Sequence, residues 1–196
     1  LMQKFIFTVF ILFGLSYQEI YSQPFQICSG AGQNSCTCAT APIICSINEL
    51  DGYNFQMSTY QHPWDGPTPM CNPMPPGSGG TQSNNPTWVG FIAYCEGFTL
   101  EIVYNGCSGS GTARGLQAAI YSDCTNPELN VVDGGCATDW DCTPPPCYGC
   151  GVTSGTRIMN ISGLVIGQVY YLLVDGCGGS SCNVTINVLN TQGSCV

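Results

Sequence analysis

The stretch that most constrains the fold is residues 168–188, which read QVYYLLVDGCGGSSCNVTINV. Residues 169–174 form an unbroken apolar run rich in aromatic and branched side chains, whereas residues 184–188 alternate apolar with polar. The first pattern indicates a buried strand and the second a half-buried one. The glycines between them suit a tight connection, and Cys177 and Cys182 are placed to bridge its ends. The sequence therefore predicts a hairpin clamped by a Cys177–Cys182 disulfide.

Shorter strand patterns occur elsewhere in the chain. Apolar and polar residues alternate in residues 98–104, and we expect this strand to pair with residues 88–94 as a hairpin. One helical turn is predicted at residues 46–50, where Ser46 and Glu49 have the spacing of a capping box. About seven short strands separated by turn signals favour an all-β, antiparallel two-sheet sandwich, jelly-roll-like and with almost no helix, over a closed barrel. The remaining predicted strands are residues 115–121, 130–133 and 156–162.

The start of the chain has the pattern of a secretory signal peptide, predicted at residues 1–22. Lys4 precedes an apolar run over residues 5–15, and the small residue Ser22 stands where cleavage is expected. The run is shorter than the roughly 20 apolar residues that a membrane span needs, so we expect no membrane insertion after the signal is cleaved. Residues 23–196 are then expected to form a single domain, since this length suits one core.

The 15 cysteines all follow the predicted signal peptide. Such a density persists where thiols are oxidised, which predicts a secreted or cell-surface protein rich in disulfides. Zinc is the rival explanation, and it is disfavoured because His62 is the only histidine. We predict a Cys107–Cys124 disulfide across neighbouring strand ends. The odd number leaves one cysteine free, bonded to another molecule, or paired with a segment outside this sequence.

Two segments are too irregular to be assigned to the sheets. Residues 53–87 are predicted to be a long loop rich in proline and aromatic residues, and residues 134–151 a cysteine-rich knob. Aromatic rings exposed in the loop would stack on sugar rings, which makes Tyr60 and Trp64 candidate ligand-binding residues. The alternative is that these rings cover a sheet edge or the open end of the sandwich, because aromatic burial is the default.

The formal charge of −9, from 3 Lys+Arg against 12 Asp+Glu, limits the partners of the chain. Nucleic-acid binding is excluded because Arg114 and Arg157 cannot form a basic patch. An anionic membrane surface is excluded for the same reason. Only 8% of the residues are charged, so the surface must consist largely of neutral polar side chains. Extracellular proteins, further copies of this chain and glycans remain as partners.

The sequence does not indicate a catalytic constellation. A Ser-His-Asp arrangement would have to use His62, which lies in the irregular loop, and no nucleophile-elbow sequence accompanies it. The paired carboxylates of a glycosidase would come from acids that, on a sheet, are more often solvated surface. We therefore expect a noncatalytic protein, with glycoside hydrolysis as a remote alternative. The acids concerned are Glu96, Glu101, Asp123 and Glu128.

Calcium is the candidate cofactor, although the sequence requires none. Carboxylates near loop ends suit a hard cation with oxygen ligands. No spacing matches a calcium-binding loop, so ordinary turn aspartates are the alternative. The candidate ligands are Asp133, Asp139, Asp141 and Asp175.

Three segments resemble a recurrent N-terminal extracellular domain of Bacteroidota cell-surface and secreted proteins associated with type IX secretion. They are residues 41–53 (APIICSINELDGY), residues 84–124 (NNPTWVGFIAYCEGFTLEIVYNGC…GLQAAIYSDC) and residues 167–188 (GQVYYLLVDGCGGSSCNVTINV). The resemblance implies a β-sandwich similar to bacterial pre-peptidase C-terminal domains and a noncatalytic surface or adhesive role, with no active residues to carry over. The chain departs from the family in the extra cysteines of residues 136–150 and in ending at Val196 without a sorting domain. A fragment of a larger protein and a stand-alone subunit are the two alternatives.

Together these features predict a noncatalytic extracellular structural or adhesive module. We expect it to bind protein partners, or its own copies, by strand addition at open sheet edges and through the loop at residues 53–87. The alternative function is carbohydrate binding through Tyr60 and Trp64.

Overall fold

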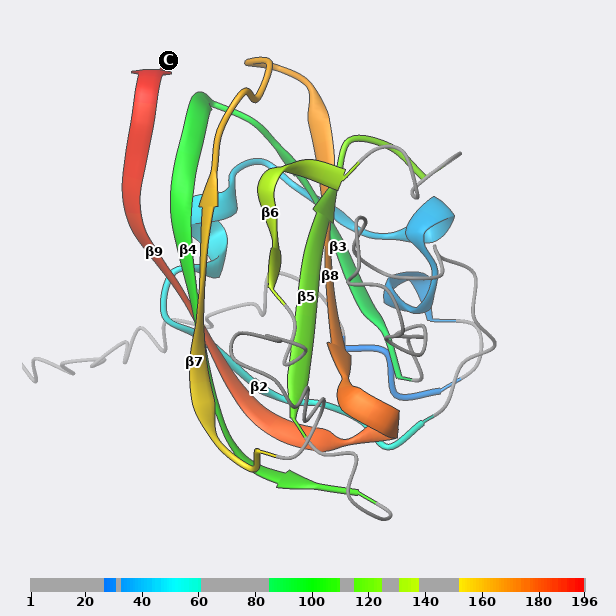
Figure 1. Ribbon diagram of the computed structural model, residues 1–196. Coiled ribbons are helices and arrows are strands. Elements are labelled where there is room, and N and C mark those ends of the chain that lie inside the picture. The colour runs from blue at the N-terminus through cyan, green and yellow to red at the C-terminus, as the bar shows by residue number, and fades with distance from the viewer. Residues whose placement is uncertain are drawn as a thin grey trace, which may run out of the picture.

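The computed structural model describes residues 27–30, 33–60, 85–109, 115–124, 131–137 and 152–195, with residue 34 and residues 131–137 described through their backbone. Within these ranges nine strands form two sheets (Figure 1). Sheet A has the strand order β1-β3-β8-β5-β6, and sheet B has the order β2-β9-β4-β7. The strands are β1 (Ile43–Ile44), β2 (Tyr53–Gln56), β3 (Thr87–Ile92), β4 (Cys95–Ser108), β5 (Leu116–Tyr121), β6 (Val131–Ala137), β7 (Gly155–Ile161), β8 (Val169–Gly176) and β9 (Ser181–Cys195). Short 3-10 helices within these ranges are η1 (Asn34–Cys36), η2 (Cys38–Thr40), η3 (Ile47–Leu50) and η5 (Cys177–Gly179).

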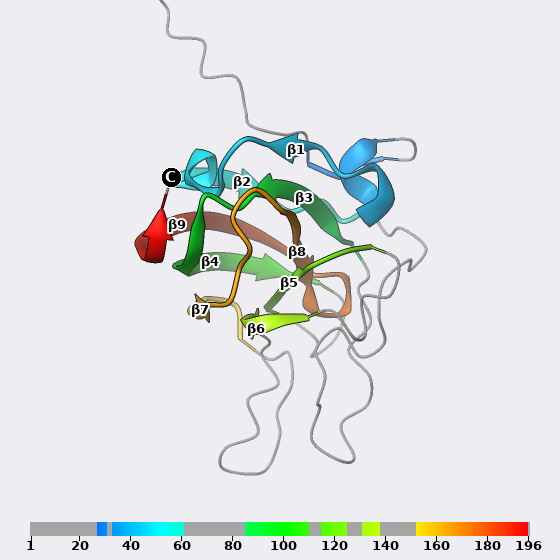
Figure 2. The ribbon, with the colours of Figure 1, turned by 90° about the horizontal axis from the view of Figure 1, so that it is seen from above.

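The predicted all-β, two-sheet sandwich is confirmed. The described strand pairs are antiparallel except β1 with β3, which is parallel. Figure 2 shows the sheets as two layers, and their inward side chains form the main core. Phe91 of β3 meets Phe98 of β4 edge-on across this interface, with 5.6 Å between the ring centroids. Full burial of one such side chain stabilises the fold by about 1.5–3 kcal/mol.

The two predicted hairpins are wrong, because the chain crosses between the sheets at both places. β3 lies in sheet A and β4 in sheet B, and Ala93 between them bonds to another segment. Its N–H donates to the Gln168 carbonyl (2.9 Å), and its carbonyl accepts from Gly167 N–H (2.8 Å). Likewise β8 lies in sheet A and β9 in sheet B. The crossing after β8 is tight, since a Cβ on Gly176 would lie 1.8 Å from the Ser180 carbonyl oxygen, and glycine alone fits there.

Sheet A is buried on both faces, which explains the unbroken apolar run of β8. Its inner face packs on sheet B. Part of its outer face is covered by the N-terminal strap, which we define as residues 33–42 and which carries η1 and η2 (Figure 2). A second core cluster lies on this outer side, where the Trp88 and Tyr121 ring centroids are 5.5 Å apart. Cys38 of the strap belongs to this cluster and is bonded to Cys124, just after β5, so the strap is covalently attached to the sheet.

The predicted disulfides Cys107–Cys124 and Cys177–Cys182 are wrong. Cys107 lies on β4 in sheet B, whereas Cys124 follows β5 in sheet A, so their strand ends are not neighbours. Cys182, the second residue of β9, lies beside β4 and bonds to Cys107. Cys177 lies in η5, between the two sheets, and is itself disulfide-bonded. Cys45 is a free and exposed cysteine. The four disulfides between described cysteines are Cys28–Cys36, Cys38–Cys124, Cys95–Cys195 and Cys107–Cys182.

The structure corrects part of the predictions for the two irregular segments. Residues 53–56, at the start of the predicted loop, form β2 and pair with β9. β6 contains residues 131–133 of the strand predicted at residues 130–133 and continues into the first residues of the predicted knob. The predicted helical turn is confirmed as η3, in which Ser46 and Glu49 form a complete capping box. Residues 61–84 of the predicted loop, residues 138–151 of the predicted knob and the predicted signal peptide lie outside the described residues.

The strap disulfide gives a stability prediction. Replacing Cys38 and Cys124 by serine together releases the strap from sheet A, and we expect the free energy of unfolding to fall by about 2–5 kcal/mol. The measurement is urea unfolding under nonreducing conditions. Cys45→Ser is the matched control, because it removes an exposed thiol that takes part in no disulfide, and it is expected to change stability by less than about 0.5 kcal/mol. An equal loss of unfolding free energy in both variants would contradict the stabilising role of the Cys38–Cys124 bond.

Tyr121 gives a prediction at alkaline pH. Burial raises the pKa of Tyr121, and the nearby Asp175 carboxylate raises it further. The unfolded chain loses this proton near the ordinary tyrosine pKa of about 10 while the folded chain keeps it, so the stability is intact below that pH and falls as pH rises above it. Above pH 10 the free energy of unfolding should fall less steeply with pH in Tyr121→Phe than in the unsubstituted chain. The two slopes should differ by about 1.4 kcal/mol per pH unit. Urea unfolding across this range measures the difference, and parallel curves would contradict the argument.

Candidate functional site

An exposed half of strand β9 is the candidate site. β9 pairs with β4 from Ser181 to Cys195, but it pairs with β2 over only Asn183 to Ile186. No described strand pairs with its other side beyond that point, and residues 189–194 are all exposed. We call residues 189–194 the open edge. The backbone N–H and C=O groups along the unpaired side of such a strand are available to another chain.

The open edge is held in place although its side chains are exposed. Cys195 at its end is bonded to Cys95 at the start of β4, which keeps the last residues of β9 paired with that strand. Glu96 adds a second tie, because its Oε2 accepts a hydrogen bond from Ser194 N–H (3.3 Å). A Cβ on Gly193 would lie 2.4 Å from that same oxygen, so the contact requires glycine there. Figure 1 shows the end of β9 (red) running beside β4 at the margin of sheet B.

A groove of about 370 Å³ borders the first half of the open edge. One wall is η3 and the residue that follows it, and the other is β9. The capping box fixes the start of η3, and its Ile47 and Leu50 are buried in the main core. Asp51 then reaches β9, where its Oδ1 accepts a hydrogen bond from Val188 N–H (2.8 Å). The groove is lined by Asn48, Asp51, Val188, Leu189, Asn190 and Thr191.

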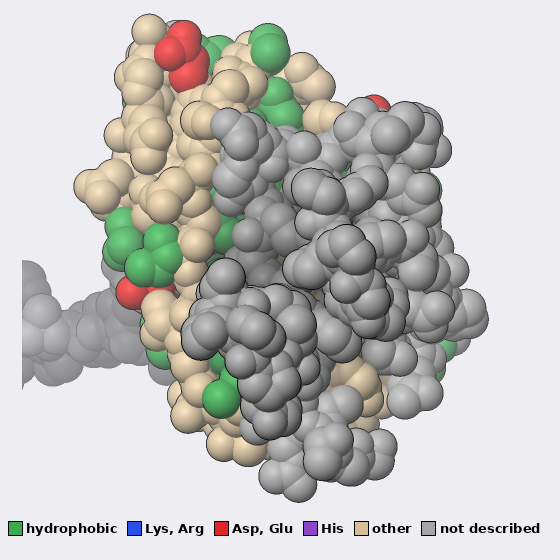
Figure 3. Space-filling model, in the orientation of Figure 1, with side chains coloured by type: hydrophobic (Ala, Val, Ile, Leu, Met, Phe, Trp, Pro, Cys, Tyr) green, Lys and Arg blue, Asp and Glu red, His purple; other side chains and the backbone are tan. Residues whose placement is uncertain are grey.

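Charge is placed at both ends of the open edge and is missing between them. Asp51 binds the backbone just before the edge, and Glu96 binds it at the far end. The six residues of the edge itself are uncharged. Arg157 on β7 is the one lysine or arginine within the described ranges, and it lies over the Tyr104 ring, 5.7 Å from the centroid. Figure 3 shows acidic side chains at the tip where β9 ends and a largely neutral surface over the described strands of this face.

The outward face of sheet B is a second exposed surface, but its polar side chains bond to one another. The bonds run between neighbouring strands, so several donors and acceptors of this face are already engaged. Cross-strand pairs of this kind stabilise a sheet, and they leave the backbone of the open edge as the freer hydrogen-bonding surface. The pairs are Thr99–Asn160 (3.1 Å), Asn187–Glu101 (2.8 Å) and Thr185–Asn54.

Asp175, a predicted calcium ligand, is fully buried. Its Oδ1 accepts from Asn85 N–H (2.9 Å), and its Oδ2 accepts from Gln117 Nε2 (2.6 Å). Asn85 in turn donates through Nδ2 to the Ser58 carbonyl (2.6 Å) and the Ser180 carbonyl (2.8 Å). The carboxylate thus joins β8, β5 and the segment before β3 in one buried network. A cation at this position would have to displace these amide donors.

The structure does not bring the other predicted calcium ligands to Asp175. Asp133 lies on β6, whose side chains are not described, and Asp139 and Asp141 lie outside the described residues. Within the described part of the chain, no group of three or more His, Cys, Asp or Glu side chains is arranged to hold a metal ion. A calcium site at these residues stays a prediction.

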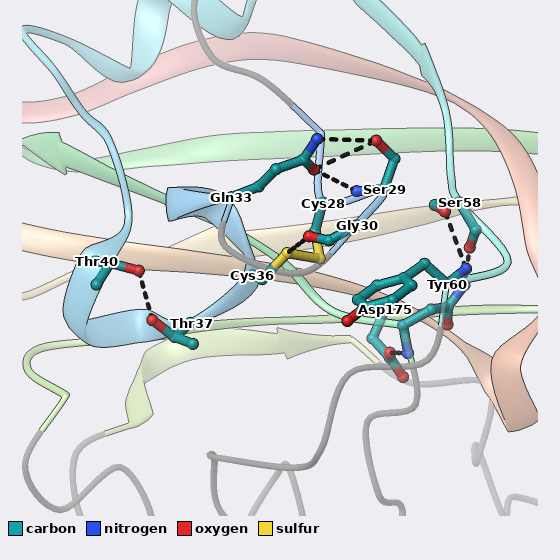
Figure 4. The surroundings of a disulfide bond; sticks show 11 residues. Cys28, Ser29, Gly30, Gln33, Cys36, Thr37, Thr40, Ser58, Tyr60 and Asp175 are labelled. Atoms are coloured by element: carbon teal, nitrogen blue, oxygen red, sulfur yellow. Dashed lines mark hydrogen bonds between the residues drawn. A yellow bond between two sulfur atoms is a disulfide. The ribbon is translucent and has the colours of Figure 1, made fainter.

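The structure describes one of the two predicted sugar-stacking residues. Tyr60 is half-buried, and its N–H donates to Ser58 Oγ (2.9 Å). Figure 4 shows its ring turned toward the strap, among the residues around the Cys28–Cys36 disulfide. Trp64 lies outside the described residues. The structure therefore places one ring of the pair at the strap and leaves carbohydrate stacking a prediction.

No protein family, curated protein or solved structure matches this chain. The resemblance to the Bacteroidota domain therefore rests on its three sequence segments alone. Within the described ranges, no helix has the length and apolar character needed to cross a membrane. The disulfides indicate an oxidising environment, as the cysteine count predicts.

The buried network gives a prediction about Asp175. Asp175→Asn removes the charge and turns an amide donor toward groups that themselves donate, so we expect the free energy of unfolding to fall by about 1–3 kcal/mol or more. Glu101→Gln is the control, because Glu101 is only half-buried and accepts from a single side-chain amide, that of Asn187. Urea unfolding at neutral pH compares the two variants. A loss no larger than that of Glu101→Gln would contradict a structural role for Asp175.

Proposed function

We propose that this chain is a noncatalytic extracellular structural or adhesive module that binds protein partners. The observation that carries the proposal is the open edge, an exposed strand segment without a described neighbour on one side. An edge of this kind is a template on which another chain can add a strand. Main-chain hydrogen bonds supply the affinity in that mode of binding, so the function requires no reactive side chain.

The disulfides support the extracellular part of the proposal. Four of them join described cysteines, and bonds of this kind persist in oxidising compartments outside the cytosol. The signal-peptide pattern of residues 1–22 and the resemblance to surface domains agree with that location. A covalently braced sandwich also suits a module that has to stay folded where no chaperone refolds it.

The binding surface favours a protein over a glycan. Sugar-binding sites commonly present aromatic rings to the apolar faces of sugars. The described residues that line the groove beside the open edge have amide, carboxylate, hydroxyl and aliphatic side chains, and none of them is aromatic. Four of these residues, Val188 to Thr191, are consecutive along β9, which suits an extended peptide.

An adhesion assay on treated cell surfaces tests the proposal. The full chain, secreted and oxidised, is coated on wells, and the attachment of cells is measured against wells coated with albumin. The cells are left untreated, treated with trypsin to remove surface proteins, or treated with periodate to oxidise the diols of glycans. We expect attachment to untreated and periodate-treated cells, and its loss after trypsin.

The opposite pattern, with loss after periodate and survival after trypsin, would replace the proposal by carbohydrate binding. Attachment equal to that on albumin would overturn an adhesive role. A sample that is fully reduced and alkylated is the matched control, because it keeps the composition of the chain and loses the disulfides that hold the sandwich.

A further inference from the structure

We propose that the Cys95–Cys195 disulfide is a redox-sensitive latch. Its reduction by a low-molecular-weight thiol releases the tail of β9, which we define as residues 189–195, while the rest of the sandwich stays folded. Two observations carry the inference, the exposure of this bond and the different attachment of the two halves of β9. The latch goes beyond the proposed function, because it operates whatever the open edge binds.

The Cys95–Cys195 bond is the accessible one among the four disulfides between described cysteines. Cys195 is exposed, as is every residue of the tail. The cysteines of the other three bonds are buried, apart from the half-buried Cys124. Exposed disulfides are open to attack by thiolates and are more labile than buried ones. We therefore expect Cys95–Cys195 to be reduced before the other three.

The reduction takes place in two exchange steps at the exposed sulfur. A small thiolate attacks the Cys195 sulfur, forms a mixed disulfide there and releases Cys95 as a thiolate. A second small thiolate attacks the outer sulfur of the mixed disulfide and releases Cys195 as a thiolate. In total, two small thiols are oxidised to one disulfide. Their two electrons and two protons convert the protein disulfide into two cysteine thiols.

Little besides the disulfide holds the tail on β4. Its residues are all exposed, its pairing with β4 shifts register twice, and Gly193 has a left-handed φ of +72°. Two long hydrogen bonds add to that pairing. Ser194 N–H donates to Glu96 Oε2 over 3.3 Å, and Gln192 Nε2 donates to Thr99 Oγ1 over 3.4 Å. A segment with few buried contacts and exposed hydrogen bonds opens at a low free energy.

The first half of β9 is held independently of the latch. Cys182, near its start, is bonded to Cys107 of β4, and both cysteines are buried. Residues 183–186 pair with β2 on one side and with β4 on the other, and their apolar side chains belong to the main core. Release of the tail should therefore stop near Val188, whose N–H is bound by Asp51.

Strand β4 also keeps its place when the tail leaves, because its other side is already paired. Phe98 lies opposite Ile161 of β7, and the Glu96 carbonyl accepts from Leu164 N–H (2.9 Å). The start of β4 is then a fixed strand that has lost its neighbour on the β9 side. Because the open edge is part of the tail, reduction removes the strand to which the proposed function assigns the partner. That consequence alone rests on the proposed function.

Graded reduction of the full oxidised chain tests the latch. The free thiol of Cys45 is first blocked with one alkylating reagent, so that it cannot exchange with the disulfides. The protein is then incubated with increasing concentrations of reduced glutathione, and the new thiols are labelled with a second reagent and located by peptide mass mapping. We expect Cys95 and Cys195 to be labelled together, about tenfold faster than the cysteines of the other three described bonds.

Hydrogen exchange measures what the reduction releases. In the partially reduced protein, the amides of residues 189–195 should exchange about tenfold faster or more, whereas those of β8 and of residues 100–104 should keep their protection. Cys95→Ser with Cys195→Ser should give the same pattern without reductant. Cys45→Ser is the matched control and should leave the exchange of the tail unchanged, because Cys45 takes part in no disulfide.

Earlier reduction of any other described bond would overturn the inference. So would a tail that keeps its protection after Cys95–Cys195 is reduced, or a loss of protection throughout both sheets, since the bond would then hold the whole fold. Adhesion is measured separately on the partially reduced protein. Adhesion that persists with a released tail would leave the latch standing and refute the open edge as the adhesive surface.

Discussion

Burial of sheet A on both faces is the constraint on which the rest of the sandwich depends. Sheet B covers one face and the N-terminal strap covers part of the other, so the central strand β8 can be apolar without interruption from Val169 to Val174. The strap is too short to form a layer with a core of its own. Its attachment through Cys38–Cys124 converts a loosely packed segment into a fixed cover, beneath which Trp88 and Tyr121 are fully buried. The bond therefore holds a cover on this face of the sheet, a role that a packed helix has in larger domains.

Local patterns in the sequence were sufficient for several of the strands and for which of their residues face the core. Alternation correctly places Phe98, Leu100 and Ile102 in the core, and the Ser46 to Glu49 spacing correctly identifies a capped turn. Such patterns do not specify which strands pair. Residue 93 bonds to residues 167 and 168, a contact between segments far apart in the chain, and this contact directs β3 and β4 into different sheets. The disulfide predictions failed for the same reason, because they assumed that strands adjacent in sequence are adjacent in space.

The candidate site was harder to find from sequence than the fold. Residues 189–194 are neutral and, apart from Leu189, not hydrophobic, with neither the alternation of a half-buried strand nor the glycine and proline clusters of a loop. They are ordered by a cysteine 100 positions earlier in the chain and by a glutamate beside it. Tertiary bonds therefore make this segment a strand, and no local propensity signals it. The acidic residues at its ends were visible in the sequence, but their distance from each other along the chain concealed that they serve one edge.

The Ser58–Asn85 hydrogen bond has a consequence for how this fold changes over time. It joins the two residues that stand just outside the long proline-rich stretch, and Asp175 fixes Asn85 from beneath. Because the sandwich holds both flanks, the entropy of closing the stretch between them grows only slowly as residues are added to it. Residues inserted there are therefore expected to cost the fold little through this entropy. The scaffold thus separates a fixed frame from a position where the length of the chain can change.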